Sequence, residues 1–120
     1  MTAKICVLLC AALVLITGCG KPEGLPDPGN LVSYRGQNDT VLYFEVTGKT
    51  SGGVWGDGIY SDDSELATAA VHAGVLAEGE TGVVKVTILP GQEEYGSSEN
   101  NGVTSWSYGE WSGSYKVEKI

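Results

Sequence analysis

The chain has 120 residues and a formal net charge of −8, with only three cysteines and one histidine. Its length suggests one domain with a modest core. The acidic excess disfavours nucleic acid and anionic lipid headgroups as partners, because both would be repelled. Neutral glycans, cationic partners and divalent ions remain as candidates.

The first residues have the pattern of a secretory signal. Lys4 precedes an apolar run over residues 5–16, which is too short for a comfortable transmembrane helix. The run ends in ITGC at residues 16–19, which resembles a bacterial lipobox. We expect residues 1–18 to be removed as a lipoprotein signal peptide and Cys19 to carry the lipid. An ordinary signal peptide with an incidental cysteine is the alternative.

Residues 19–30 are predicted to be the lipidated cysteine and a flexible tether. Three prolines and three glycines lie within residues 20–30 and disfavour regular structure. The lipid would place the domain, residues 31–120, on the cell envelope. If the source is Gram-negative, Gly20 favours the outer membrane because it is not the aspartate of the usual sorting rule. The other two cysteines fall in the removed segment, so no thiol remains for disulfides.

Apolar alternation predicts the strands before the helix. Residues 31–34 form a short first strand, and residues 40–47 form a stronger one with Leu42, Phe44 and Val46 on one face. Residues 53–60 form a third strand, in which glycines favour a bulge or a close approach of another backbone.

The sequence VWGDGIYSDDSELATAAVHAG at residues 54–74 organises the rest of the chain. It predicts a strand, an acidic helix start, a helix over residues 66–73 and a stop at Gly74. Asp62 with Glu65 three residues later resembles a capping box. A helix this short is marginal alone, and its alanines allow close packing on several faces. We therefore expect a central helix enclosed by sheet.

After the helix, residues 81–89 predict a strand with Val84, Val86 and Ile88 on one face, ended by Pro90-Gly91. Residues 92–99 form a polar loop, and Asn101-Gly102 is the best tight-turn dipeptide of the chain. Residues 103–108 and 114–119 are closing strands. The order predicts an α+β fold with antiparallel sheets.

Residues 55–74 resemble the core motif of the LCCL domain, an extracellular module. The resemblance continues in GVVKV at residues 82–86, in PGQ at residues 90–92 and in NGVTS at residues 101–105, and further at Tyr95 and Ser98. It covers roughly residues 54–117 and implies an α+β fold with one short helix wrapped by antiparallel sheet. Members often carry a cysteine where this chain has Ala67, and paired cysteines before the Trp-Gly. The resemblance therefore implies a form that lacks the family's disulfides.

His72 is the first candidate for catalysis. Ser64 lies eight residues before it, about 12 Å away along a helix, whereas a general base must lie within about 3 Å of its nucleophile. Ser97 or Ser98 from the loop could reach His72 only through the fold. No G-x-S-x-G elbow is present. We expect His72 to be hydrogen-bonded near the helix end, and we expect no catalytic residues and no enzyme activity.

Metal and cofactor sites are not indicated. Asp57, Asp62 and Asp63 offer oxygen ligands, but their spacing does not follow the calcium-loop pattern. A lone histidine without usable cysteines excludes the common zinc sites. The sequence predicts no cofactor.

A binding surface is the remaining class of site. Aromatic faces and amides suit sugar rings, and Trp106 and Tyr108 belong to this wider group, although each aromatic residue alone is as well explained by packing. The loop over residues 92–101 adds to the case, because loops on a rigid scaffold commonly carry recognition. The predicted ligand-binding residues are Tyr60, Asp62, Asp63, His72, Tyr95, Ser98, Asn101 and Trp111.

The leading hypothesis is a non-enzymatic binding or interaction module displayed on the envelope. Its expected partners are the membrane through Cys19, an envelope polysaccharide or lipopolysaccharide, or an envelope protein, and not nucleic acid. The LCCL resemblance implies the lipopolysaccharide candidate. The alternatives are a small envelope hydrolase using His72 with a loop hydroxyl or with Asp62 or Asp63, and a purely structural lipoprotein. Burial of His72 against backbone carbonyls would argue against the hydrolase.

Overall fold

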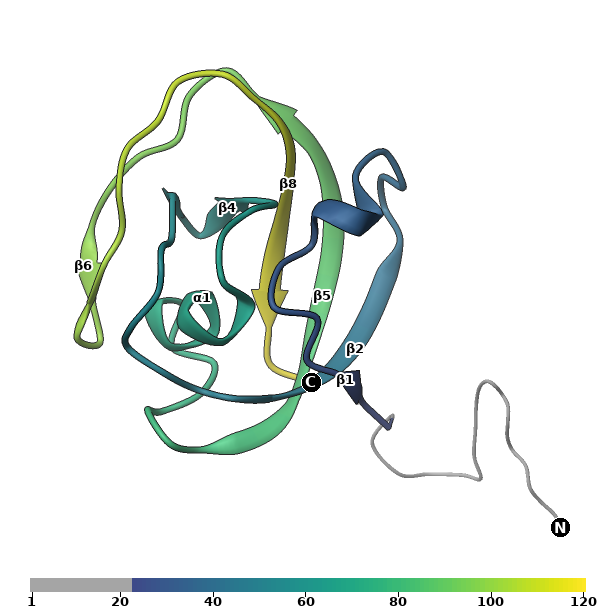
Figure 1. Ribbon diagram of the computed structural model, residues 1–120, viewed down its shortest axis with the longest axis vertical. Helices are drawn as coiled ribbons and strands as arrows, with labels where there is room; N and C mark the ends of the chain where they lie inside the picture. The colour runs from purple at the N-terminus through teal and green to yellow at the C-terminus, as the bar shows by residue number, and fades with distance from the viewer. Residues whose placement is uncertain (1–22) are drawn as a thin grey trace, which may run out of the picture.

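The computed structural model describes residues 23–120 (Figure 1). Cys19 and the predicted signal peptide lie outside the described residues. The elements are β1 (Leu25–Pro26), the 3-10 helix η2 (Val32–Tyr34), β2 (Val41–Thr47), β3 (Gly56–Asp57), β4 (Ile59–Ser61), α1 (Leu66–His72), β5 (Thr81–Gln92), β6 (Glu99–Asn100), β7 (Val103–Thr104) and β8 (Trp111–Glu118). None of the helices over residues 23–120 has the length and apolar character needed to cross a membrane.

One six-stranded sheet organises the fold, in the order β1-β2-β5-β8-β4-β3. The strand β5 lies in the middle: Val86 pairs with Leu42 of β2 on one side and with Val117 of β8 on the other. All pairings in the sheet are antiparallel except β1 with β2, which is parallel. A separate hairpin joins β6 and β7. The predicted α+β class with largely antiparallel strands is confirmed, and α1 is the single α-helix of residues 23–120.

The core lies between the sheet and α1. The predicted inward residues of β2 and β5, such as Phe44 and Val86, are buried. All seven residues of α1 are buried, and the helix contacts β2, β6, β7 and β8. In Figure 1, α1 sits inside the curve of β5 and β8, with the β6 region on its other side. Small alanine side chains allow this approach from several directions, as the sequence predicts.

The predicted capping box at Asp62 is wrong. Glu65 is the N-cap residue of α1, and no side chain caps the first turn. The Asp62 carboxylate instead accepts hydrogen bonds from Arg35 and Trp111. Arg35 carries a full positive charge, whereas a helix start offers only a partial one, so the carboxylate pairs with Arg35 and lies away from the helix start.

Three predicted boundaries before and after the helix are also wrong. Residues 32–34 form a 3-10 turn rather than a strand. Leu25–Pro26, within the predicted tether, pairs with β2. The strand β5 continues through Pro90 to Gln92. Because β2 pairs with β5 only as far as Thr87, β5 has one unpaired edge at Pro90, where a proline is tolerated.

Two turns follow the prediction closely. Asn101 and Gly102 have φ values of 56° and 84° and form the tight turn of the β6–β7 hairpin. Gly56 has φ 118° and lies against the Ile59 carbonyl, where a side chain would clash. The predicted irregular strand is therefore split into β3 and β4. The predicted strand over residues 103–108 is shorter than expected and ends after Thr104.

Candidate functional site

A buried carboxylate fixes one end of the molecule. Asp62 is 1% exposed. Its Oδ2 accepts from Arg35 Nε at 2.7 Å, and its Oδ1 accepts from Arg35 Nη2 and from Trp111 Nε1, both at 2.8 Å. Burial alone would raise the pKa of Asp62, but the hydrogen bonds from Arg35 and Trp111 outweigh it and hold this pKa below its ordinary value. Asp62 therefore stays ionised and ties two distant segments together.

Aromatic side chains extend outward from this carboxylate. The Arg35 guanidinium lies 5.4 Å from the centroid of the Trp111 ring, and the Trp111 ring meets Tyr108 edge-on at 5.7 Å. Trp106 is 61% exposed and Tyr108 is 49% exposed. We call Trp106, Tyr108 and Trp111 the aromatic face.

The backbone beneath the aromatic face is pinned at two points. Trp106 N donates to Val54 O at 2.8 Å, while Tyr95 and Tyr108 exchange two backbone bonds of 2.8 and 3.1 Å. Both exposed rings, Trp106 and Tyr108, therefore lie on a segment that is held to the scaffold.

A shallow hollow of about 460 Å³ lies beside Tyr108. Its lining consists of Glu93, Glu94, Tyr95, Ser107, Tyr108 and Gly109, and we call it the Tyr108 hollow. Its volume falls within the range of small-ligand sites. The hollow combines an exposed aromatic ring with two carboxylates.

His72 is 2% exposed and lies in a closed polar cluster. Its Nε2 is 3.1 Å from the Ser98 carbonyl oxygen and 3.1 Å from Ser98 Oγ, and its Nδ1 is 2.9 Å from the Tyr60 hydroxyl. A carbonyl oxygen only accepts, so the cluster is satisfied when Nε2 carries the proton and Nδ1 accepts from Tyr60.

This arrangement disfavours the hydrolase hypothesis. The fold does bring Ser98 to His72, which the sequence could not show. The nitrogen facing the serine is occupied as a donor, and no carboxylate of the described residues bonds to the other nitrogen. A general base needs an available lone pair toward its nucleophile. His72 instead joins the loop before β6 to the core.

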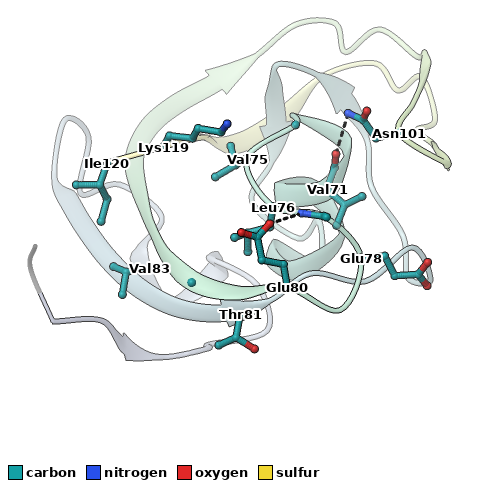
Figure 2. Close-up of a pocket in the computed structure, with 13 residues that line it drawn as sticks. Val71, Val75, Leu76, Glu78, Glu80, Thr81, Val83, Asn101, Lys119 and Ile120 are labelled. Atoms are coloured by element: carbon teal, nitrogen blue, oxygen red, sulfur yellow. Dashed lines mark hydrogen bonds between the residues drawn. The ribbon is translucent and has the colours of Figure 1, made fainter.

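A second, larger hollow of about 790 Å³ lies at the end of α1 (Figure 2). Val75, Leu76, Val83 and Ile120 supply apolar surface, and Glu80 and Lys119 lie at its sides. Two of its polar side chains already have partners: Glu80 accepts from Ala77 N at 2.8 Å, and Asn101 Nδ2 donates to Val71 O at 3.1 Å. The Tyr108 hollow, whose carboxylates have no such bonds, is the better candidate for recognition.

The predicted ligand-binding residues divide by burial. Tyr60, Asp62, His72 and Tyr95 are at most 2% exposed and hold the fold together. Asp63 accepts from Ser61 Oγ, Ser98 contacts His72, and Asn101 bonds the last carbonyls of α1. Trp111 is the one of the eight that joins the aromatic face.

Four site residues were considered only as part of the wider aromatic group or of the loop over residues 92–101 and were left out of the eight predicted binding residues: Trp106, Tyr108, Glu93 and Glu94. The aromatic pair has a signal in the sequence, because SWSYGEW at residues 105–111 repeats aromatic residues in a segment rich in serine and glycine. Within residues 23–120, no group of three or more histidine, cysteine, aspartate or glutamate side chains could hold a metal ion.

Comparison with known proteins supports this reading of the fold. A sequence model described as the LCCL domain matches residues 33–115. Human cochlin is 41% identical over 66 residues, which is 55% of this chain and 12% of cochlin. Guinea pig (Cavia porcellus) cochlin is equally similar, and mouse (Mus musculus) vitrin is 39% identical over 64 residues, or 10% of its length. The chain thus matches only a small part of these relatives. Because the family match spans more than half of the chain, the chain belongs to the LCCL domain family.

Proposed function

We propose that the domain is a non-enzymatic binding module that recognises an envelope polysaccharide through the aromatic face. The observation that carries this proposal is the exposure of Trp106 and Tyr108 on a pinned segment. Aromatic rings pack against the apolar C–H faces of sugars, and rigid rings lose little entropy on binding. The other predicted aromatic residues, Tyr60 and Tyr95, are buried and support the scaffold.

The test compares glycans by their effect on stability. The full chain in detergent is heated with envelope polysaccharides, peptidoglycan fragments and lipopolysaccharide. A ligand that binds only the folded state raises the melting temperature in a concentration-dependent way. We expect a rise with one polysaccharide class and little response to lipopolysaccharide, because its phosphates are repelled by a chain of net charge −8.

The double variant Trp106→Ala/Tyr108→Ala locates the site. Two stacking contacts of about 1 kcal/mol each predict at least about tenfold weaker binding. Leu25→Ala/Ile120→Ala is the matched control, because both are exposed apolar residues: Leu25 lies on the edge strand β1, and Ile120 follows the opposite end of β8 from Trp111. Equal weakening in both variants would remove the aromatic face from the proposal. A panel without any response would favour a protein partner or a structural role.

We further propose that lipid on Cys19 displays the module on the cell envelope. Several acyl chains anchor a protein firmly, whereas one binds only marginally. Metabolic labelling with a traceable fatty acid should mark the wild-type protein and not Cys19→Ser. Cys10→Ser is the control and should keep the label. Label on Cys19→Ser would contradict the anchor.

A further inference from the structure

We propose that the Tyr108 hollow selects its polysaccharide by charge and binds protonated amino groups of an amino-sugar polymer that is not fully N-acetylated. This inference rests on the proposed recognition of polysaccharide by the aromatic face. It adds the chemical class of the ligand, which the aromatic rings alone do not specify.

The hollow has fixed walls. Tyr95 on one wall and Tyr108 on the other exchange backbone hydrogen bonds of 2.8 and 3.1 Å. Tyr95 is itself 2% exposed, so its wall is part of the packed interior. Glu93 and Glu94 precede Tyr95 directly and are exposed. The carboxylates and the Tyr108 ring are therefore presented at one place on the surface without rearrangement of the backbone.

The carboxylates of the hollow lack protein partners. No hydrogen bond or ion pair within residues 23–120 uses the side chain of Glu93 or Glu94. The ion pairs of this region join Arg35 to Asp62, Lys49 to Glu65 and Lys116 to Glu118. No lysine or arginine lines the hollow. Two carboxylates without a neighbouring cation create a local negative potential.

A protonated amine satisfies both features of the hollow. It pairs with a carboxylate, and it is attracted to the face of an aromatic ring within about 6 Å. A neutral sugar leaves the carboxylates without a role, and an acidic sugar is repelled by them. An amino-sugar unit also offers an apolar C–H face, which suits the exposed ring of Tyr108 and the Trp111 ring beside it.

The experiment compares two probes of equal length that differ in charge. Chitosan oligomers carry protonated amines, and chitin oligomers carry neutral N-acetyl groups. Binding to the full chain in detergent is measured at mildly acidic pH, where the amines of chitosan are protonated. We expect chitosan to bind at least about tenfold more tightly than chitin at low salt, and the difference to shrink at high salt because exposed charges are screened.

The double variant Glu93→Gln/Glu94→Gln tests the hollow. It should weaken chitosan binding about tenfold and leave chitin binding unchanged, because each exposed charge contact contributes severalfold. Glu23→Gln/Glu45→Gln is the control: it makes the same change in net charge at exposed positions outside the hollow. Equal loss in both variants would overturn the site and leave only a general charge effect.

The outcomes separate this inference from the proposed function. Equal binding of chitin and chitosan would overturn the charge selection and retain polysaccharide recognition. If the chain binds neither oligomer and also responds to no glycan of the wider panel, both the charge selection and polysaccharide recognition would be overturned. Polylysine of similar charge is the third probe: binding as tight as that of chitosan, lost in Glu93→Gln/Glu94→Gln, would overturn the amino-sugar class in favour of a basic protein.

Discussion

At the scale of single residues, Asp62 is the side chain on which the candidate site depends most. Asp62→Asn keeps the shape of the side chain but removes its charge. It should lower the free energy of unfolding by about 2 kcal/mol, because two charge-assisted bonds from Arg35 and one from Trp111 are weakened. Urea unfolding measures the change, and tryptophan fluorescence reports the environment of Trp111. Asp57→Asn is the control, since Asp57 is exposed.

The loss should depend on pH. Because the folded state holds the pKa of Asp62 below its ordinary value of 3.8, it favours the ionised form. The stabilisation is present above this value and is lost as the pH falls through the lower folded pKa. The stabilities of the wild-type protein and Asp62→Asn should therefore converge as the pH falls from 3.8 through the lower folded pKa. A constant difference down to the acid transition would show that the charge of Asp62 is not responsible.

The partners of Asp62 could not be predicted from the sequence. Capping is a local interaction, so the spacing of Asp62 and Glu65 pointed to the helix start. Arg35 lies 27 positions earlier and Trp111 lies 49 positions later, and such long-range pairs have no local pattern. The contact between Ser98 and His72 could not be predicted either, because these residues are 26 positions apart. The inward residues of β2 and β5 were predicted correctly because alternation is read within one strand.

At the scale of elements, the β6–β7 hairpin closes the end of α1. Asn101 Nδ2 donates to Val71 O at 3.1 Å and lies 3.4 Å from His72 O, so it adds a side-chain partner to the last carbonyls of α1 (Figure 2). Asn101 also has φ 56°, a conformation that glycine adopts freely and alanine does not. The amide and the backbone conformation can be separated by substitution.

Asn101→Gly should lower the free energy of unfolding by about 1 kcal/mol, because it removes the hydrogen bonds and keeps the turn. Asn101→Ala should cost about 1 kcal/mol more, because it adds strain in the left-handed region. Thermal and urea unfolding of both variants check this order. Equal stability of the two variants would show that the turn relaxes, and a neutral Asn101→Gly would show that the amide does not support α1.

The boundary of an element could be predicted where one residue of the element ends it. It could not be predicted where pairing with another strand sets the boundary. Gly74 follows α1 closely, as the sequence indicated. Pro90-Gly91 does not end β5, because β8 continues to pair with it as far as Gln92. Leu25–Pro26 joins the sheet for the same reason, since the exposed edge of β2 offers a place to pair.

At the scale of the whole molecule, β5 separates two regions. Thr81 at its start lines the hollow beside α1, and Gln92 at its end pairs with Trp111 of the aromatic face. Twelve residues of strand span about 35 to 40 Å when extended. Glu93 and Glu94 follow this far end of β5, so substitutions at Asn101 should change stability without changing the preference for chitosan over chitin.

The core of the molecule also contains tyrosine hydroxyls, which makes its stability sensitive to alkali. Tyr60 and Tyr115 are fully buried; Tyr60 bonds His72, and Tyr115 donates to Ser64 O at 2.9 Å. Burial raises the pKa of Tyr60 to about 12 and raises that of Tyr115 well above its ordinary value of 10. Because the folded state binds these protons more tightly than the unfolded state, the stabilisation is complete below pH 10 and is lost as the pH rises through the folded values.

Urea unfolding from neutral pH to about pH 12 should therefore show a free energy of unfolding that falls steeply above pH 10. Tyr60→Phe/Tyr115→Phe should begin less stable at neutral pH, because it loses two buried hydrogen bonds, and should then fall less steeply. Parallel curves for the two proteins would mean that the alkaline loss arises elsewhere on this acidic chain. A shallower curve for the variant would show that the alkaline loss of stability arises from these buried hydroxyls, which join β4 to His72 and β8 to Ser64. The core would then be held by specific polar contacts as well as by apolar packing.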